Sequence, residues 1–312
     1  MKLNMAAKKR REAYIFILPG FIYLVAICGY PLIYNLILSF KNVNVKNLAT
    51  GASVFVGLDN YKQLFADPTF QLVFKNTIEF TLACLVVQFT IGFLFAMFFS
   101  KKFTLAGPIR GLVLVGYMMP MSVTALLGKN LFLLDGGVIN DLLMKVHLIS
   151  SPIDWLVNGG TALGAVIAVN CWVGIPFNML LLTSGLTGIS TDIYESASMD
   201  GANAFKRWLY ITIPASKNTF TFVIMTSTIA ALKRFTEIYA VSRETGNPAG
   251  KLETIMLYIY KNSFSTLNYK DEGLAGAASV ILFIIILAAT VLNNKLTGER
   301  KPRRSKRIGG KA

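Results

Sequence analysis

Long apolar stretches separated by short polar segments dominate this sequence of 312 residues. Windows of about 20 mostly apolar residues have the length needed to cross a hydrocarbon layer about 30 Å thick. Each such window predicts one membrane-spanning helix, and the whole pattern predicts an all-α membrane protein. The six predicted spans cover residues 14–40, 72–99, 109–133, 161–186, 218–241 and 274–294.

Basic residues give the chain an orientation in the membrane. Lys and Arg occupy positions 8–11 before the first span, and the segment "ERKPRRSKR" follows the last one. An even number of spans puts both ends on one side, and the positive-inside rule places that side in the cytoplasm. The expected parts are a basic amino-terminal segment at 1–13, a six-span membrane domain at 14–294 and a basic tail at 295–312.

The net charge of +15 has a simple explanation in a membrane protein. Basic residues beside terminal spans hold topology and contact anionic lipid, so they do not indicate a nucleic-acid partner. The three cysteines, Cys28, Cys84 and Cys171, all fall inside predicted spans, where a thiol behaves as a small buried hydrophobe.

Two outer loops carry short amphipathic segments. In residues 41–71, Tyr61, Leu64 and Phe65 recur at helical spacing, and "VINDLLMKVHLI" gives a second such segment within residues 134–160. We expect these segments to form caps on the outer surface of the bundle, either as sites for an external partner or as seals.

Motifs of catalysis and of nucleotide binding are missing from the sequence. The single histidine, His147, lies in an outer loop, no Cys/His cluster has the spacing of metal ligands, and no GxxxxGK[ST] loop is present. We therefore expect neither an enzyme nor a metal site.

Ionisable residues inside spans indicate a functional role, because burying a charge in the membrane costs several kcal/mol unless the charge faces a polar cavity or a partner. Glu79 falls in the second span, and Lys233, Arg234 and Glu237 fall in the fifth. One interpretation is a structural salt bridge between Lys233 and Glu237, which are four residues apart. The alternative is a hydrophilic passage whose candidate residues are Asn76, Gln88, Asn170, Trp172, Phe177, Asn178, Thr226, Lys233 and Glu237.

The fourth predicted span contains the stretch "NCWVGIPFN". Gly174 and Pro176 within it predict a break of the helix in the middle of the membrane. Near such a break, Trp172 and Phe177 could stack on a sugar ring while the amides bind its hydroxyl groups.

A polar segment between the fourth and fifth spans predicts a cytoplasmic helix-turn-helix. Thr191 or Asp192 is the expected cap of a short helix at 192–199, Gly201 permits a sharp turn, and a second helix runs over 202–213 to Pro214. The expected coupling loop as a whole covers residues 187–217.

The residues of this segment carry a specific resemblance. "ESA", three residues, Gly201, nine residues and then "ITIP" are similar to the signature of permease subunits of bacterial ATP-binding-cassette (ABC) importers. The stretches "YPLIYNLILSF", "FVGLDNYKQLFADPTF" and "INDLL" further resemble the maltose-type sugar permeases. One departure is "TGNPAG" at 245–250, where that class often has "TGGGP".

The resemblance implies a type I importer permease fold and a set of partners. These are a second permease subunit, two ATPase subunits that use ATP and Mg²⁺, and an external solute-binding protein. No cofactor is expected on this chain, and the substrate is expected to be a sugar, with an oligosaccharide favoured. The residues implied to dock on the ATPase are Glu195, Ser196, Ala197, Met199, Asp200, Gly201, Ala202, Phe205 and Pro214.

Two alternatives remain at this point. An ABC permease of this kind could carry a polyol or a glycerol phosphate instead of a sugar. An ion-coupled secondary carrier would use Glu79 or Glu237 as its ion site, and it would need no ATPase.

Overall fold

A computed structural model describes residues 2–44, 47, 53–101, 103–245, 250–264 and 271–297 of the chain. The chain divides into two units. One comprises Met1–Gln71 and Tyr258–Phe283, and the other comprises Leu72–Leu257 and Ile284–Ala312. Three helices have residues in both units, namely α5 (Pro68–Phe99), α15 (Ile255–Phe264) and α16 (Glu272–Thr297). The predicted basic tail lies almost wholly outside the described residues, as does most of "TGNPAG".

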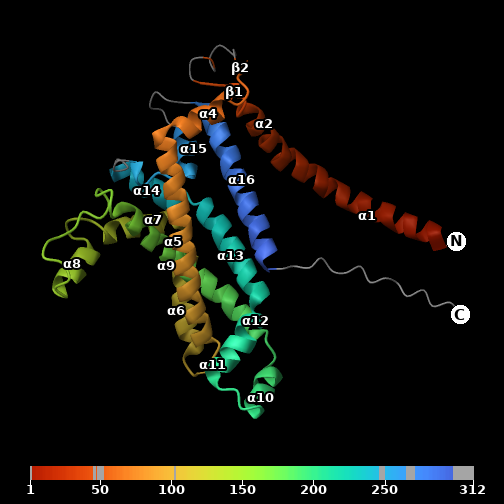
Figure 1. The fold of residues 1–312 in the computed structure, drawn as a ribbon, viewed down its shortest axis with the longest axis vertical. Coiled ribbons are helices and arrows are strands. Elements are labelled where there is room, and N and C mark those ends of the chain that lie inside the picture. The colour runs from red at the N-terminus through yellow and green to blue at the C-terminus, as the bar shows by residue number, and fades with distance from the viewer. Residues whose placement is uncertain are drawn as a thin grey trace. The chain divides into compact units, whose positions relative to one another are not determined.

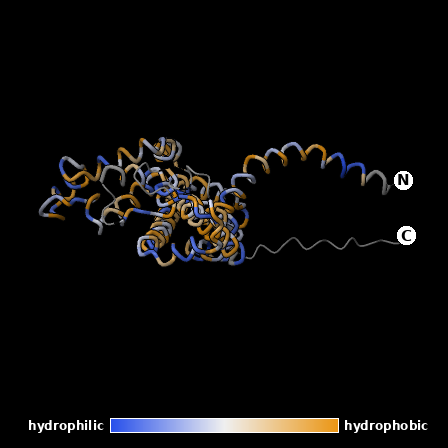
Figure 2. The backbone as a smooth tube through the Cα atoms, turned by 90° about the horizontal axis from the view of Figure 1, so that it is seen from above, coloured by the Kyte–Doolittle hydropathy of each residue, from blue (hydrophilic) through white to orange (hydrophobic). Residues whose placement is uncertain are grey.

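The first unit begins with a long apolar helix. It consists of α1 (Lys2–Leu24), the π-helical turn η1 (Val25–Gly29) and α2 (Tyr30–Leu38). Figure 2 shows the change from hydrophilic to hydrophobic residues along α1. The most apolar part of the stretch Ala7–Leu38 has no residue buried inside the chain. Such a surface is stable against lipid or another membrane helix, so this helix is the first span.

The rest of the first unit contains the predicted outer cap. Strands β1 (Lys41–Asn42) and β2 (Val54–Phe55) pair antiparallel, with Lys41 opposite Phe55. Helix α4 (Asp59–Ala66) follows and buries Leu64 completely. The Asn60 side chain donates to the backbone oxygens of Ser39 and Lys41, at 2.9 Å each. The amphipathic helix predicted around Tyr61 and Leu64 is thus confirmed.

The second unit contains a buried apolar core, and Figure 1 shows the course of its helices. Its helices include α6 (Ala106–Met118), α7 (Met121–Leu131), α8 (Val138–Lys145), α9 (Ala162–Thr187), α13 (Lys217–Leu232) and α14 (Thr236–Thr245). The largest cluster of buried side chains joins α5, α9 and α14 through Phe80, Val166 and Ile238. A second cluster joins α5, α9 and α13, with Phe220 packed edge-on against Phe93.

Close approach of α5 and α9 depends on two glycines. A Cβ atom at Gly92 would lie 2.7 Å from Cβ of Asn178, and one at Gly174 would lie 2.1 Å from Cδ of Gln88. Both distances are too short for real atoms, so a side chain at Gly92 would separate the helices, and one at Gly174 would force the Gln88 side chain to move. Small residues at helix crossings are a common device in membranes, where close contact replaces hydrophobic exclusion from water.

Two of the six predicted spans are not single straight helices. Within the described residues, the helices long and apolar enough to span a membrane are Ala7–Leu38, Pro68–Phe99, Ala162–Thr187 and Glu272–Lys295. The span predicted at 109–133 is the pair α6 and α7, bent by 95°. Pro120 explains the bend, because Met119 before it takes an extended conformation and the ring removes one donor.

The span predicted at 218–241 ends as a helix at Leu232. Residues 233–235 interrupt it before α14 begins, and the amide of Arg234 donates to the oxygen of Ala231, which ends the α-helical ladder. In contrast, the break predicted at Gly174 and Pro176 is wrong, since α9 is continuous through both. Packing of α9 against its neighbours holds this turn, and the side chain of Asn178 donates to the Gly174 oxygen at 2.8 Å.

Candidate functional site

A helical hairpin follows α9 and forms the first part of the candidate site. It comprises α10 (Thr191–Met199), α11 (Ala204–Arg207), the π-helical turn η2 (Trp208–Thr212) and α12 (Ile213–Ala215). Gly201 lies in the turn with φ of +78°, a conformation that glycine adopts without strain. The two predicted helices and the predicted turn are therefore confirmed.

Polar caps define both helices of the hairpin. The hydroxyl of Ser190, rather than Thr191 or Asp192, caps α10 by accepting from the amide of Asp192 at 3.3 Å. The predicted cap was one or two residues late because Ser190, with its extended backbone, precedes the first helical residue. Asn203 caps α11 in the same way, accepting from the amide of Lys206 at 2.9 Å.

Side-chain contacts hold the two arms of the hairpin together. The hydroxyl groups of Tyr194 and Thr212 lie 2.9 Å apart, and Arg207 donates to the hydroxyl of Ser198 at 2.7 Å. The amide of Ala202 donates to the oxygen of Ala197 at 2.9 Å across the turn. The two arms of the hairpin are thus held together by hydrogen bonds between side chains and across the turn.

The outer surface of this hairpin carries large apolar side chains. Met199 is 90% exposed and Phe205 is 65% exposed, although both lie on a polar segment outside the predicted spans. Large apolar side chains gathered on one exposed surface are one feature of protein interfaces. Of the other residues predicted for docking, Glu195, Ser196, Asp200, Gly201 and Pro214 are exposed, and Ala197 and Ala202 are half-buried.

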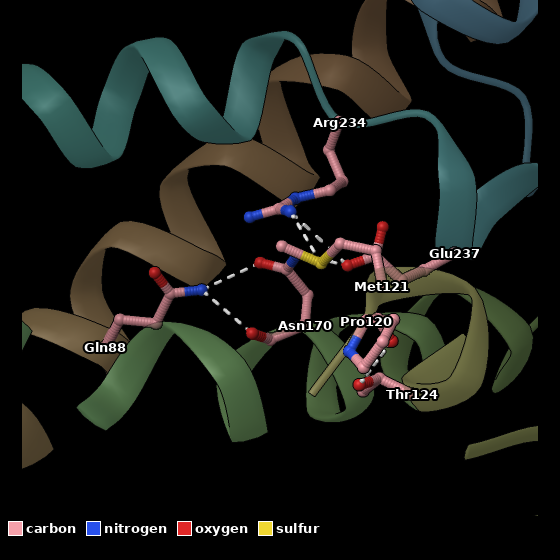
Figure 3. Close-up of polar contacts among 7 residues, drawn as sticks. All are labelled: Gln88, Pro120, Met121, Thr124, Asn170, Arg234 and Glu237. Atoms are coloured by element: carbon pink, nitrogen blue, oxygen red, sulfur yellow. Dashed lines mark hydrogen bonds and ion pairs between the residues drawn. The ribbon is translucent and has the colours of Figure 1, made fainter. Parts of the chain in front are cut away.

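A buried polar network forms the second part of the candidate site (Figure 3). The side-chain amide of Gln88 on α5 donates to Oδ1 of Asn170 on α9 at 2.7 Å. Asn170 donates in turn to Oε1 of Glu237 on α14 at 3.3 Å. Arg234, in the interruption before α14, lies 3.5 Å from the same carboxylate oxygen. The network therefore joins three helices at the point where the fifth predicted span is interrupted.

The charges in this network are paired, though not completely. Glu237 is fully buried, and its Oε2 has no hydrogen-bond partner among the described residues, nor does Nε of Arg234. The predicted salt bridge between Lys233 and Glu237 is not observed. Because the helix ends at Leu232, these two residues no longer share a helical face, and Arg234 takes the place of Lys233 as the partner.

A cavity of about 350 Å³ adjoins the network. Its walls combine hydrogen-bonding and aromatic groups, among them Gln88, Tyr117, Phe177, Ser227, Lys233 and Arg234. Tyr117 and Phe177 stack with ring centroids 5.4 Å apart. Polar groups beside stacked rings can hold a solute that has both hydroxyl groups and an apolar face.

Most of the residues predicted to line a passage lie in or beside this cavity. Gln88, Phe177 and Lys233 form part of its wall. Asn170 and Glu237 are buried behind it, in hydrogen-bond or ion-pair contact with residues of the wall. Asn178 is also buried, and it accepts from the hydroxyl of Ser227 at 3.1 Å.

The other three of these residues lie elsewhere, and so does Glu79, which was the alternative ion site. The side chain of Asn76 donates to the backbone oxygens of Gly250 and Glu253, at 3.0 Å each, which is a structural role. Thr226 donates to the oxygen of Phe222 within its own helix. Trp172 lines a separate apolar groove of about 650 Å³ beside α7 and α8. Glu79 lies 3.5 Å from Lys75 in an exposed ion pair.

Sequence reasoning did not single out several wall residues, among them Tyr117, Met121 and Ser227. Tyr117 and Met121 come from the bent pair α6 and α7, and Ser227 comes from α13. Met121 accepts from Arg234 at 3.2 Å. The Pro120 bend that brings α7 to this site was a usable signal, since proline in a membrane helix often marks such a bend.

Comparisons with known proteins agree with this geometry. A family model described as "Binding-protein-dependent transport system inner membrane component" matches residues 88–296. The chain is 29% identical over 288 residues to the inner membrane ABC transporter permease protein YcjO of Escherichia coli (strain K12), covering 91% of this chain and 93% of that protein. It is 29% identical over 286 residues to the lactose transport system permease protein LacF of Rhizobium radiobacter, covering 90% and 91%.

Solved structures share the fold. A bacterial ABC transporter involved in the import of the acidic polysaccharide alginate contains a chain that matches with a TM-score of 0.79 at 21% identity. The match covers 95% of this chain and 98% of that one. The fold observed here is therefore that of an ABC importer permease.

Proposed function

Because the chain belongs to the binding-protein-dependent transport system inner membrane component family, we propose that it forms half of the translocation path for a sugar in an ABC importer. The family is a membrane permease component, which does not itself carry out catalysis. The braced hairpin with its exposed apolar residues is the observation that best supports a coupled transporter. The chain is a multi-pass membrane protein, and both its termini are proposed to lie in the cytoplasm.

Sugar is the proposed substrate for two reasons. The cavity beside the polar network offers an amide, hydroxyl groups and stacked rings, which suit a solute with hydroxyl groups on an apolar ring. The relatives include permeases for lactose and, in Bacillus subtilis (strain 168), for arabinooligosaccharides, the latter 28% identical over 298 residues. A polyol or a glycerol phosphate is a less favoured substrate for the same cavity.

The proposed assembly contains partners that supply energy and substrate. A second permease subunit completes the path, and an external solute-binding protein delivers the sugar. Two ATPase subunits bind ATP and Mg²⁺, and this chain is proposed to bind neither ATP nor Mg²⁺. Closure of the ATPases moves the hairpin as one body and opens the cavity to the outside. Hydrolysis of ATP then opens the cavity to the cytoplasm, so the site is accessible from the two sides of the membrane in turn.

A photo-crosslinking experiment tests the hairpin's partner. A photo-reactive amino acid replaces Met199 in the assembled transporter, and a matched control replaces Leu148, which is 72% exposed in an outer loop. We expect Met199 to crosslink to the ATPase and Leu148 not to. An ATPase crosslink from Leu148, or none from Met199 in an intact complex, would contradict the assignment.

A further inference from the structure

The cavity of about 350 Å³ has an unbalanced charge. Two cationic side chains, those of Lys233 and Arg234, form part of its wall. Arg234 is balanced by Glu237, whose Oε1 lies 3.5 Å from it. Lys233 has no ion pair with any acidic residue in the described part of the chain. Among the described residues, one positive charge at the cavity is therefore left without an acidic partner.

The remaining groups of the cavity wall do not balance this charge. Among the described residues of the wall, the other polar side chains are neutral, namely Gln88, Tyr117, Ser227 and Thr236, and none is a carboxylate. The Lys233 side chain is exposed at this cavity, so its ammonium group can meet a solute that enters, and water there weakens but does not abolish its attraction for an opposite charge. In membrane proteins, ionisable residues that line a water-filled cavity often belong to a substrate or ion pathway.

We propose that the cavity takes a sugar that carries a negatively charged group, a carboxylate, sulfate or phosphate, and that Lys233 is its counter-charge. The inference rests on the proposed function and narrows it. Tyr117 and Phe177 supply a stacking surface for the sugar ring, while Gln88 and Ser227 supply polar contacts for its hydroxyl groups. A negatively charged group beside Lys233 would neutralise the local charge of the occupied cavity.

The electrical potential of the cavity can be measured without knowing the substrate. Ala230 lines the cavity, is exposed, and lies in the last turn of α13, three residues before Lys233. An Ala230→Cys variant of the reconstituted complex, with exposed Cys28 changed to serine, is treated with methanethiosulfonate reagents of similar size. One reagent carries a sulfonate and the other a trimethylammonium group. Ser150→Cys in an outer loop is the control position.

We expect the anionic reagent to react faster at Ala230→Cys. Adding Lys233→Met should lower the ratio of anionic to cationic rates about tenfold, while Lys233→Arg should change it less than about twofold. The ratio at Ser150→Cys should not respond to either change. A ratio at Ala230→Cys that Lys233→Met leaves unchanged would overturn the proposal, and Thr236→Cys repeats the test if Ala230→Cys fails to assemble.

A second measurement addresses the substrate directly. Binding-protein-stimulated ATP hydrolysis is measured with oligosaccharides bearing uronate, sulfate or phosphate groups and with neutral oligosaccharides of the same length. We expect stimulation by an acidic sugar, which Lys233→Met lowers and Lys233→Arg preserves. Stimulation by neutral sugars alone, unaffected by Lys233→Met, would overturn the inference. Stimulation by neither set would count against the proposed sugar substrate, and the reagent ratio would then decide the charge of the cavity.

Discussion

Replacing Glu237 by glutamine should strongly destabilise the protein, because it would leave the Arg234 guanidinium buried without a counter-charge. The two side chains are 16% and 0% exposed, and Nη1 of Arg234 lies 3.5 Å from Oε1 of Glu237. At an effective dielectric constant of about 20, charges at this distance attract each other by about 5 kcal/mol. Loss of one partner from a buried pair costs about 3–5 kcal/mol, so the two magnitudes agree.

A double-mutant cycle separates this pair from its surroundings. The variants are Glu237→Gln, Arg234→Met and the combination of both, and glutamine keeps an oxygen that can accept from Asn170. Free energies of unfolding are measured for the purified protein in detergent by titration with sodium dodecyl sulfate. We expect the double variant to lose less stability than the sum of the two single variants, with a coupling energy of about 2 kcal/mol or more.

The chain contains a matched control at the same distance. Lys75 and Glu79 also lie 3.5 Å apart, but their side chains are 68% and 52% exposed. An exposed pair at this spacing contributes about 0.3–0.5 kcal/mol, so Glu79→Gln should have little effect. If the variants of Glu237 and Arg234 add without coupling, or if Glu237→Gln costs no more than Glu79→Gln, then the electrostatic argument is refuted.

Other variants test the hairpin, the cavity and the hydrogen bonds of Asn76. The Gly201→Val variant should assemble normally but transport sharply less sugar, because valine is strained at φ of +78°. The Glu195→Ala variant should lower uptake less. Normal uptake by the valine variant would contradict the coupling role. A cysteine in the Phe177→Cys variant should react with small polar thiol reagents in the resting or the nucleotide-trapped transporter. A cysteine in the Trp172→Cys variant should react more slowly, since of these two residues only Phe177 lines the polar cavity. Equal rates would refute this placement. The Asn76→Leu variant should be less stable by about 1–3 kcal/mol in the same detergent titration, since it leaves two backbone oxygens without their donor. An unchanged free energy of unfolding would show that these hydrogen bonds contribute little.

Hydropathy and the spacing of a few residues were enough to predict much of this fold. The apolar windows located the long helices because the hydrocarbon thickness sets their length. The hairpin was predictable because Gly201 has a local conformational requirement, and its helices have local polar caps. These features depend on residues that are close in sequence.

The features that were mispredicted depend on tertiary structure. The partner of Glu237 changed from Lys233 to Arg234 because α13 ends at Leu232, and only then does the chain bring Arg234 to the carboxylate. Trp172 and Phe177 were predicted to line one passage, yet Trp172 lines the apolar groove and Phe177 lines the polar cavity. Helix α9 is apolar on nearly all sides, so its packing against neighbouring helices sets which side chain faces which space. No spacing rule within the helix distinguishes these two residues.

The energy source for transport tests the central claim most directly. The chain is reconstituted in proteoliposomes with its partner permease and ATPases, and uptake of radiolabelled sugar is followed with the solute-binding protein outside. We expect uptake that requires both ATP and the binding protein and that persists when ionophores dissipate the ion gradients. Uptake by this chain without ATPase subunits, abolished by the ionophores, would contradict the account and would indicate an ion-coupled carrier instead.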